Sequence, residues 1–154
     1  DIFTVVAAES VPWHHATFGR ENPGYSRALA EQLAAGPPGL EAAAAAREAV
    51  AVEVSTLVAA LREVDLLLCA SVAAPAPEIG AEHVVVDGRR LHVEWLLTRL
   101  TSVFDAARLP ALSVPFGRTR DGLPIGVQLV GRHLEEATLL RAGRQLERRA
   151  GSEL

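Results

Sequence analysis

The sequence predicts an α/β fold, a layer structure in which helices cover a β-sheet. Three observations carry this prediction. Residues 1–64 show the helical spacing of apolar side chains, residues 109–132 contain two strand-like apolar runs around a Pro- and Gly-containing turn, and residues 135–147 form a helical segment. At 154 residues, the chain is predicted to be a single domain, mainly helical over 1–64 and mixed over 65–154.

Three helices are predicted in the N-terminal part of the chain. The first runs from Ile2 to His15, and Trp13 near its end is expected to be buried. The second covers Tyr25 to Ala35 and is stopped by the Gly-Pro-Pro-Gly sequence that follows it. The third, from Leu40 to Val64, combines an Ala-rich start of high helix propensity with apolar residues that recur every three or four positions. This third segment is the strongest helix signal in the chain.

The middle of the chain predicts a buried strand, a hairpin and a helix. The segment Asp65 to Ala70 is short and apolar, which favours a strand covered on both faces and lying deep in a sheet. Asp87-Gly88, flanked by apolar runs, is a dipeptide favoured in two-residue hairpin turns. Pairing across that turn places His83 opposite His92. Residues 94–104 are then predicted to form one helix with an apolar side.

Two strands and a helix are predicted at the C-terminal end. The strands are Ala111 to Val114 and Ile125 to Val130, separated by turn-forming residues that include Pro124. The helix begins at Glu135 and ends before Gly151. Its acidic start and arginine-rich end complement the helix dipole.

Composition and charge exclude several classes of function. The net charge is −4, and all fifteen basic residues are arginines scattered along the chain, so no nucleic-acid partner is expected. A single cysteine, Cys69, lies in an apolar run and fits a buried side chain in a reducing, cytoplasmic setting. No apolar run approaches the roughly 18 residues of a membrane span, so no membrane association is expected. The sequence contains no methionine, and we therefore expect a fragment of a longer protein.

The segment from Leu109 to Arg132, LPALSVPFGRTRDGLPIGVQLVGR, resembles the C-terminal hallmark of the amidase signature family. The resemblance extends to Glu135–Glu147 (EEATLLRAGRQLE) and to Val64–Gly80 (VDLLLCASVAAPAPEIG). It implies a mixed β-sheet covered by helices, and an enzyme that hydrolyses carboxamide C–N bonds without a metal or cofactor. Its implied mechanism uses a serine nucleophile, a second serine and a lysine base, all upstream of the matched region. Because this chain contains no lysine, we expect it to be the inactive C-terminal part of such a hydrolase.

The chain departs from the family pattern at several positions. Asp105 and Arg108 stand where the family usually carries Asn and Gly, and Phe116 stands where Cys is common. A glycine at position 108 often reflects a backbone shape that a long side chain fits poorly. Residues 69–74 differ as well, because Thr and Pro are more usual there. The substrate therefore does not follow from the resemblance.

The resemblance suggests four substrate-pocket residues but no catalytic residue. These are Ser71 and Val72 after the buried strand, and Phe104 and Asp105 before the hallmark. A nucleophile role for Ser113 is disfavoured, because it lies in a strand pattern without the strand-to-helix elbow of serine hydrolases and without a nearby acid–base pair. Structural roles are predicted for the serines.

His83 and His92 are the only pair that suggests a metal site. Facing each other across a hairpin, two imidazoles could reach one ion. No third ligand is evident at a suitable local spacing, so no metal site and no cofactor are predicted.

Three interpretations of function remain open. In the leading one, the longer protein is an amidase and its partner is a small-molecule amide substrate. In the second, it is the A subunit of a glutamyl-tRNA amidotransferase, which shares the same hallmark and would imply partner subunits and glutamine as ammonia donor. In the third, the chain is a non-catalytic binding or assembly domain that could form a homo-oligomer. An accidental fragment would leave strand 65–70 partly open to solvent.

Overall fold

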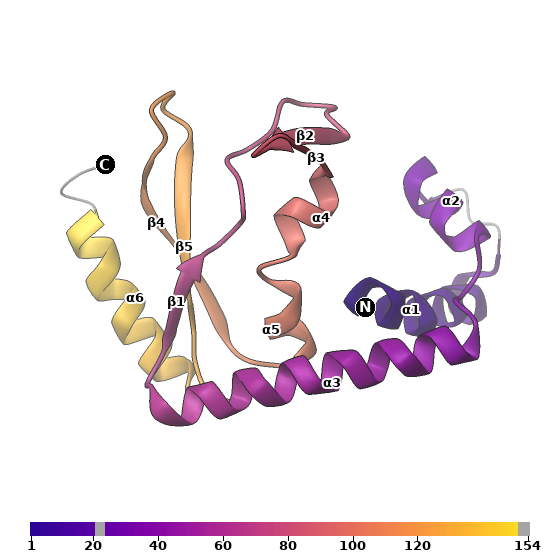
Figure 1. Cartoon of the computed structure of the whole chain (residues 1–154), viewed down its shortest axis with the longest axis horizontal. Coiled ribbons are helices and arrows are strands. Elements are labelled where there is room, and N and C mark those ends of the chain that lie inside the picture. The colour runs from indigo at the N-terminus through magenta and orange to yellow at the C-terminus, as the bar shows by residue number, and fades with distance from the viewer. Residues whose placement is uncertain (21–23, 151–154) are drawn as a thin grey trace. The chain divides into compact units, whose positions relative to one another are not determined.

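A computed structural model of the chain describes residues 1–20 and 24–150 (Figure 1). The chain groups into two compact units, Asp1–Glu53 and Val54–Leu154, which are described separately below. Helix α3 (Leu40–Glu63) contributes residues to both units. The single-domain assignment made from the sequence stays a prediction.

The first unit contains α1 (Ile2–Phe18), α2 (Arg27–Ala34) and the start of α3. All three helices were predicted from apolar spacing, and the structure confirms them. Helix α1 continues three residues beyond its predicted end, past Pro12. The α2 N-terminus is capped by Ser26, whose Oγ accepts a hydrogen bond from the Leu29 N–H at 3.3 Å.

The expectation that Trp13 is buried is wrong. The buried residue of α1 is Val11, which is 1% exposed, whereas Trp13 is 56% exposed. Two positions along an α-helix differ by about 200° around its axis, so the two side chains point to nearly opposite sides. Trp13 instead makes edge-to-face ring contacts with His14 and Phe18.

The second unit is built around a three-stranded antiparallel sheet with the order β1-β5-β4. Its strands are β1 (Leu67–Ala70), β4 (Ala111–Arg118) and β5 (Pro124–Val130). Strands β4 and β5 form a hairpin, longer than predicted and interrupted by an irregularity between Pro115 and Gly117. The predicted α/β class is confirmed.

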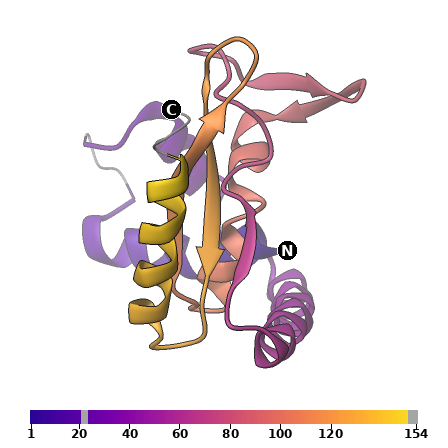
Figure 2. The same ribbon diagram turned by 90° about the vertical axis from the view of Figure 1, so that its left-hand side faces the viewer.

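Helices cover both faces of this sheet (Figures 1 and 2). Helix α6 (Glu136–Ala150) packs mainly on β4. The short helices α4 (Val93–Thr98) and α5 (Ser102–Ala106) lie on the other side. The core of this unit joins α3, α5 and the sheet through five buried residues: Leu61, Phe104, Ala107, Leu109 and Val130.

Strand β1 is not deep in the sheet, contrary to the prediction. It pairs antiparallel with β5 alone and forms one edge of the described sheet. Leu67 and Cys69 are half-buried, but Leu68 on the opposite face is 58% exposed. Because β4 pairs with the other edge of β5, β1 is the last strand of the described sheet. Its partial exposure is the outcome that we expected for a fragment.

The hairpin is confirmed in its register. Strand β2 (His83–Val86) pairs with β3 (Arg89–His92), and Val86 faces Arg89 across the turn. Both turn residues have positive φ, 50° at Asp87 and 73° at Gly88, as a type I′ turn requires.

The single helix predicted over 94–104 is wrong, because the structure divides it into α4 and α5. Two threonines at the break compete with the helical hydrogen bonds. The Thr98 hydroxyl donates to the Glu94 carbonyl at 2.7 Å, and the Thr101 hydroxyl donates to the Thr98 carbonyl at 3.0 Å. The Leu100 carbonyl, freed by the break, accepts a hydrogen bond from the Gln128 side chain on β5 at 2.8 Å.

Helix α5 ends in a Schellman motif whose left-handed residue is Arg108, with φ of 54°. The Arg108 N–H donates to the Asp105 carbonyl, and the Leu109 N–H donates to the Phe104 carbonyl, both at 3.0 Å. Phe104 and Leu109 are both core residues, so the motif's usual apolar contact is present. The backbone therefore keeps the shape that glycine favours, with an arginine in its place.

Replacing Arg108 with glycine is therefore expected to stabilise the chain. The left-handed conformation costs a residue with a Cβ about 1–2 kcal/mol, and the greater freedom of glycine when unfolded cancels about 0.5–1 kcal/mol of that gain. We expect Arg108→Gly to raise the free energy of unfolding by about 0.5–1 kcal/mol in urea titration. Arg108→Ala keeps the Cβ and should give no such gain; a loss of stability on Arg108→Gly would contradict the argument.

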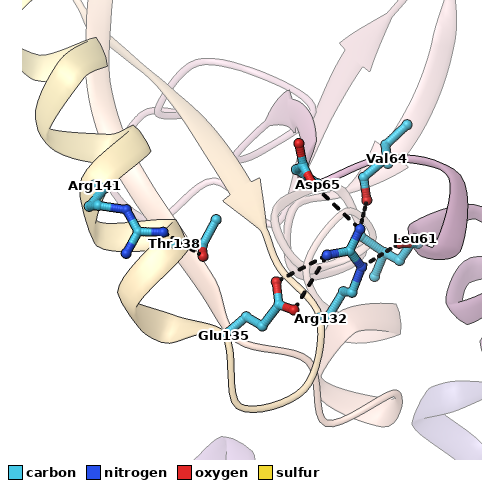
Figure 3. Close-up of polar contacts among 7 residues, drawn as sticks. All are labelled: Leu61, Val64, Asp65, Arg132, Glu135, Thr138 and Arg141. Atoms are coloured by element: carbon cyan, nitrogen blue, oxygen red, sulfur yellow. Dashed lines mark hydrogen bonds and ion pairs between the residues drawn. The ribbon is translucent and has the colours of Figure 1, made fainter.

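Arg132 joins the end of α3 to the start of α6 (Figure 3). Its Nε donates to the Leu61 carbonyl and its Nη2 to the Val64 carbonyl, each at 2.8 Å. Nη1 forms an ion pair with Glu135 at 3.2 Å, and Nη2 lies 3.6 Å from Asp65. The guanidinium thus supplies donors to carbonyls that the terminal turn of a helix leaves without partners.

Candidate functional site

The second unit contains an open pocket of about 430 Å³. It lies where three segments meet: the loop after β1, helix α4 and the start of β5. Its lining residues are Val72, Ala73, Ala74, Pro75, Ala76, Pro77, Leu97, Pro124, Ile125 and Gly126. All ten are apolar residues or glycine, so the wall offers shape and apolar contact but no side-chain charge.

A backbone hydrogen bond, a glycine and two prolines determine the path of the loop that follows β1. The pairing of β1 with β5 continues one residue beyond the end of β1. There the Ser71 N–H donates a hydrogen bond to the Gly126 carbonyl at 3.0 Å. A Cβ on Gly126 would lie 3.0 Å from the Ser71 Oγ, so the missing side chain at Gly126 is what lets Ser71 approach. Pro75 and Pro77 then hold their own φ near −65° and bias the preceding residues to extended conformations.

Ser71 and Ser113 form a hydrogen-bonded pair beside this loop. The Ser71 hydroxyl donates to the Ser113 hydroxyl at 3.0 Å, although the residues are 42 positions apart. Both hydroxyls are therefore partnered by an alcohol and not by a base. A serine without a base is a weak nucleophile, so the pair is suited to hydrogen bonding and not to acyl transfer.

Gln128, on β5, is a buried polar residue with an exposure of 2%. Its amide donates to the Ala70 carbonyl at 3.1 Å and to the Leu100 carbonyl at 2.8 Å, which ties β1 and the α4–α5 break to β5. Burial raises the pKa of the neighbouring Cys69 thiol above its usual value, against an opposing effect of its hydrogen bond with Gln128. The thiol therefore stays protonated at neutral pH and is a poor nucleophile.

The structure separates the four predicted pocket residues. Val72 is part of the pocket wall, and Ser71 directly precedes it in the loop. Phe104 lies in the hydrophobic core, and Asp105 is exposed on α5. Contact of any of the four with a substrate stays a prediction.

Sequence reasoning missed the contributions of Leu97 and of residues 124–126 to the pocket. Leu97 was assigned to an apolar helix face, and the short run at 124–126 was assigned to a turn and a strand. The prolines at 75 and 77 predicted an extended loop but not a pocket. The meeting of the three segments depends on sheet pairing, which local sequence does not specify.

The two histidines of the hairpin face each other as predicted. His83 pairs with His92, and their ring centres are 5.2 Å apart. Arg90 Nη2 lies 3.3 Å from Nδ1 of His83, so an arginine occupies that side of the ring. Within residues 1–20 and 24–150, no group of three or more His, Cys, Asp or Glu side chains is arranged to hold a metal ion.

Among the helices of the described residues, none is long and apolar enough to cross a bilayer.

Comparison with known proteins assigns the family. The sequence model of the amidase family matches residues 27–140, which is more than half of the chain. The chain belongs to the amidase family. In a search of solved structures, an amidase crystal structure superimposes with a TM-score of 0.81 at 32% sequence identity, covering 97% of this chain and 35% of that protein.

Two relatives of this amidase-family chain differ in name. The glutamyl-tRNA(Gln) amidotransferase A subunit of Rhodospirillum rubrum is 40% identical over 89 residues, which cover 58% of this chain and 17% of that protein. Fatty acid amide hydrolase of Oryza sativa subsp. indica is 35% identical over 88 residues, which cover 57% of this chain and 14% of that protein. The chain therefore spans less than a fifth of these relatives and about a third of the solved amidase.

Proposed function

We propose that this chain is the C-terminal part of an amidase that hydrolyses a carboxamide to a carboxylate and ammonia or an amine. Its role is to form part of the substrate-pocket wall and of the sheet that supports it. The catalytic residues belong to the portion of the amidase fold that this chain does not span.

The observation that carries the proposal is the pattern of coverage. Nearly all of this chain superimposes on a solved amidase, yet it accounts for 35% of that protein. The chain contains no lysine, and the Ser71 and Ser113 hydroxyls are hydrogen-bonded to each other. These features support a structural and substrate-contacting role for this portion.

The proposed mechanism of the whole enzyme uses two serines and a lysine. The neutral lysine takes a proton from the nucleophilic serine, and the second serine relays that proton. The nucleophilic serine then attacks the amide carbonyl. Backbone amides stabilise the oxyanion until the amine leaves with a proton. Water then hydrolyses the acyl-serine ester to release the carboxylate. An amine base is essential to this scheme, and an arginine is too basic to replace it.

The purified chain is expected not to hydrolyse amides. The measurement is release of 4-nitroaniline from a neutral 4-nitroanilide, with a full-length amidase as positive control. The double variant Ser71→Ala/Ser113→Ala is the matched control, because activity that persists in it comes from a contaminant. Turnover by the unaltered chain that disappears in the double variant would refute the inactivity of this portion.

The similarity to amidotransferase A subunits supports a second candidate. If the longer protein is one of them, it should release ammonia from glutamine, and that release should depend on partner subunits. Assay of the longer protein with glutamine and with a neutral amide separates the two candidates, since an amidase should act on the neutral amide alone.

A further inference from the structure

The pocket beside β5 restricts what it can bind through the chemistry of its wall. No carboxylate, guanidinium, imidazole or carboxamide side chain is among the ten lining residues. A charged group placed against this wall would lose hydration and would meet no side chain of opposite charge, which is unfavourable. An apolar group would lose only ordered water, which is favourable.

The size of the pocket suits a small ligand group. Its volume of about 430 Å³ lies in the lower part of the range of about 300–1,000 Å³ that small-molecule sites occupy. A phenyl ring or a short branched alkyl chain fits such a volume and leaves part of a longer ligand outside.

One polar feature lies at the edge of this apolar wall. Gly126 is part of the lining, and the Ser71 Oγ lies 3.0 Å from the position that a Cβ on Gly126 would take. The Ser71 hydroxyl donates a hydrogen bond to Ser113, which is not a lining residue of this pocket.

We infer that this pocket binds the uncharged, apolar part of the amide substrate, and that it discriminates against amides that carry a charge beside the reacting group. The inference rests on the proposed amidase function and adds a substrate class to it. It also separates the chain from a glutamine-using enzyme, since glutamine carries an ammonium and a carboxylate.

The test is an NMR titration of the isolated chain with three small molecules. Phenylacetamide is neutral, phenylacetate is its anionic counterpart, and glutamine is zwitterionic. We expect phenylacetamide to shift the backbone amide signals of Val72, Leu97 and Ile125. Phenylacetate and glutamine should bind at least about tenfold more weakly, because their charges meet no side chain of opposite charge in the wall.

A charge introduced into the wall should reverse this preference. Leu97→Arg should weaken phenylacetamide binding by about tenfold and strengthen phenylacetate binding. Val85→Arg is the matched control, because Val85 is 72% exposed on the β2–β3 hairpin and is not a lining residue. Ile125→Arg places the charge on β5 instead and provides the same test if Leu97→Arg does not fold.

The outcomes distinguish the inference from the proposed function. Equal binding of glutamine and phenylacetamide, or the absence of shifts at the three lining residues, would overturn the inference and leave the amidase assignment intact. Hydrolysis of phenylacetamide by the isolated chain would support the pocket's ligand class and would refute the proposed inactivity of this portion.

Discussion

Replacing Arg132 with alanine is expected to lower the free energy of unfolding by about 3 kcal/mol. The change removes the donors of two charge-assisted hydrogen bonds, to the Leu61 and Val64 carbonyls, each 2.8 Å long. Those bonds contribute about 1.5–3 kcal/mol each when the donor is charged, and the partial exposure of the guanidinium reduces that sum. The half-exposed ion pairs with Glu135 and Asp65 add little.

Urea unfolding monitored by circular dichroism measures this effect. Arg141→Ala is the matched control, because it removes an arginine side chain from α6, the helix that follows Arg132 (Figure 3). Arg141 is exposed and contacts Thr138 on its own helix at 2.9 Å, so its loss should cost less than about 0.5 kcal/mol. Arg132→Lys keeps the charge but loses the planar fork, and it should recover less than half of the stability. Full recovery by lysine would show that charge alone is important.

Replacing Gly143 with valine is expected to lower the free energy of unfolding by about 2–3 kcal/mol. Gly143 lies on the face of α6 that packs against β4, and it is buried. A Cβ there would overlap Leu112 Cδ2 and would lie 3.6 Å from Val114 Cγ2. The slightly better helix propensity of valine does not offset an overlap that forces Leu112 out of its position.

The control for this variant is Ala137→Val, which introduces the same side chain at an exposed position of α6. It should cost about 0.5 kcal/mol, the difference in helix propensity. The second measurement is a double-mutant cycle with Leu112→Ala. If the overlap with Leu112 causes the loss, the two substitutions together should be more stable than their separate effects predict, by at least about 1 kcal/mol. Simple additivity would assign the loss to another cause.

Features determined by neighbouring residues were predictable from the sequence. The Asp87-Gly88 turn was assigned from a dipeptide, because two consecutive positive φ values are accessible to few residue pairs. The long helix α3 was assigned from Ala-rich propensity and a periodic apolar stripe. The hallmark from Leu109 to Arg132 predicted two neighbouring strands and the family, and both are confirmed.

Features that depend on distant contacts were not predictable in this way. The break between α4 and α5 is coupled to a hydrogen bond from Gln128, which lies 28 residues from its acceptor, Leu100. The edge position of β1 follows from its pairing with β5, and the exposure of Trp13 follows from which side of α1 is covered. Apolar periodicity shows that a residue prefers burial but does not show whether a partner surface is available.

The candidate site shows the same division. The resemblance directed attention to Ser71 and Val72, at the start of the loop that lines the pocket. It did not indicate that Leu97 and Ile125 complete the wall, because each comes from another segment.

The sequence by itself determined most of the local elements, the amidase family and the absence of a lysine base, because each depends on residue identity and short-range spacing. Only the tertiary structure decided that an apolar pocket forms beside β5 and that a serine pair borders it. It also decided that Arg108 adopts a left-handed backbone and that Arg132 binds the end of α3. The physical reason is that these features require contacts between segments far apart in the chain, and their formation depends on strand pairing and on the satisfaction of buried polar groups.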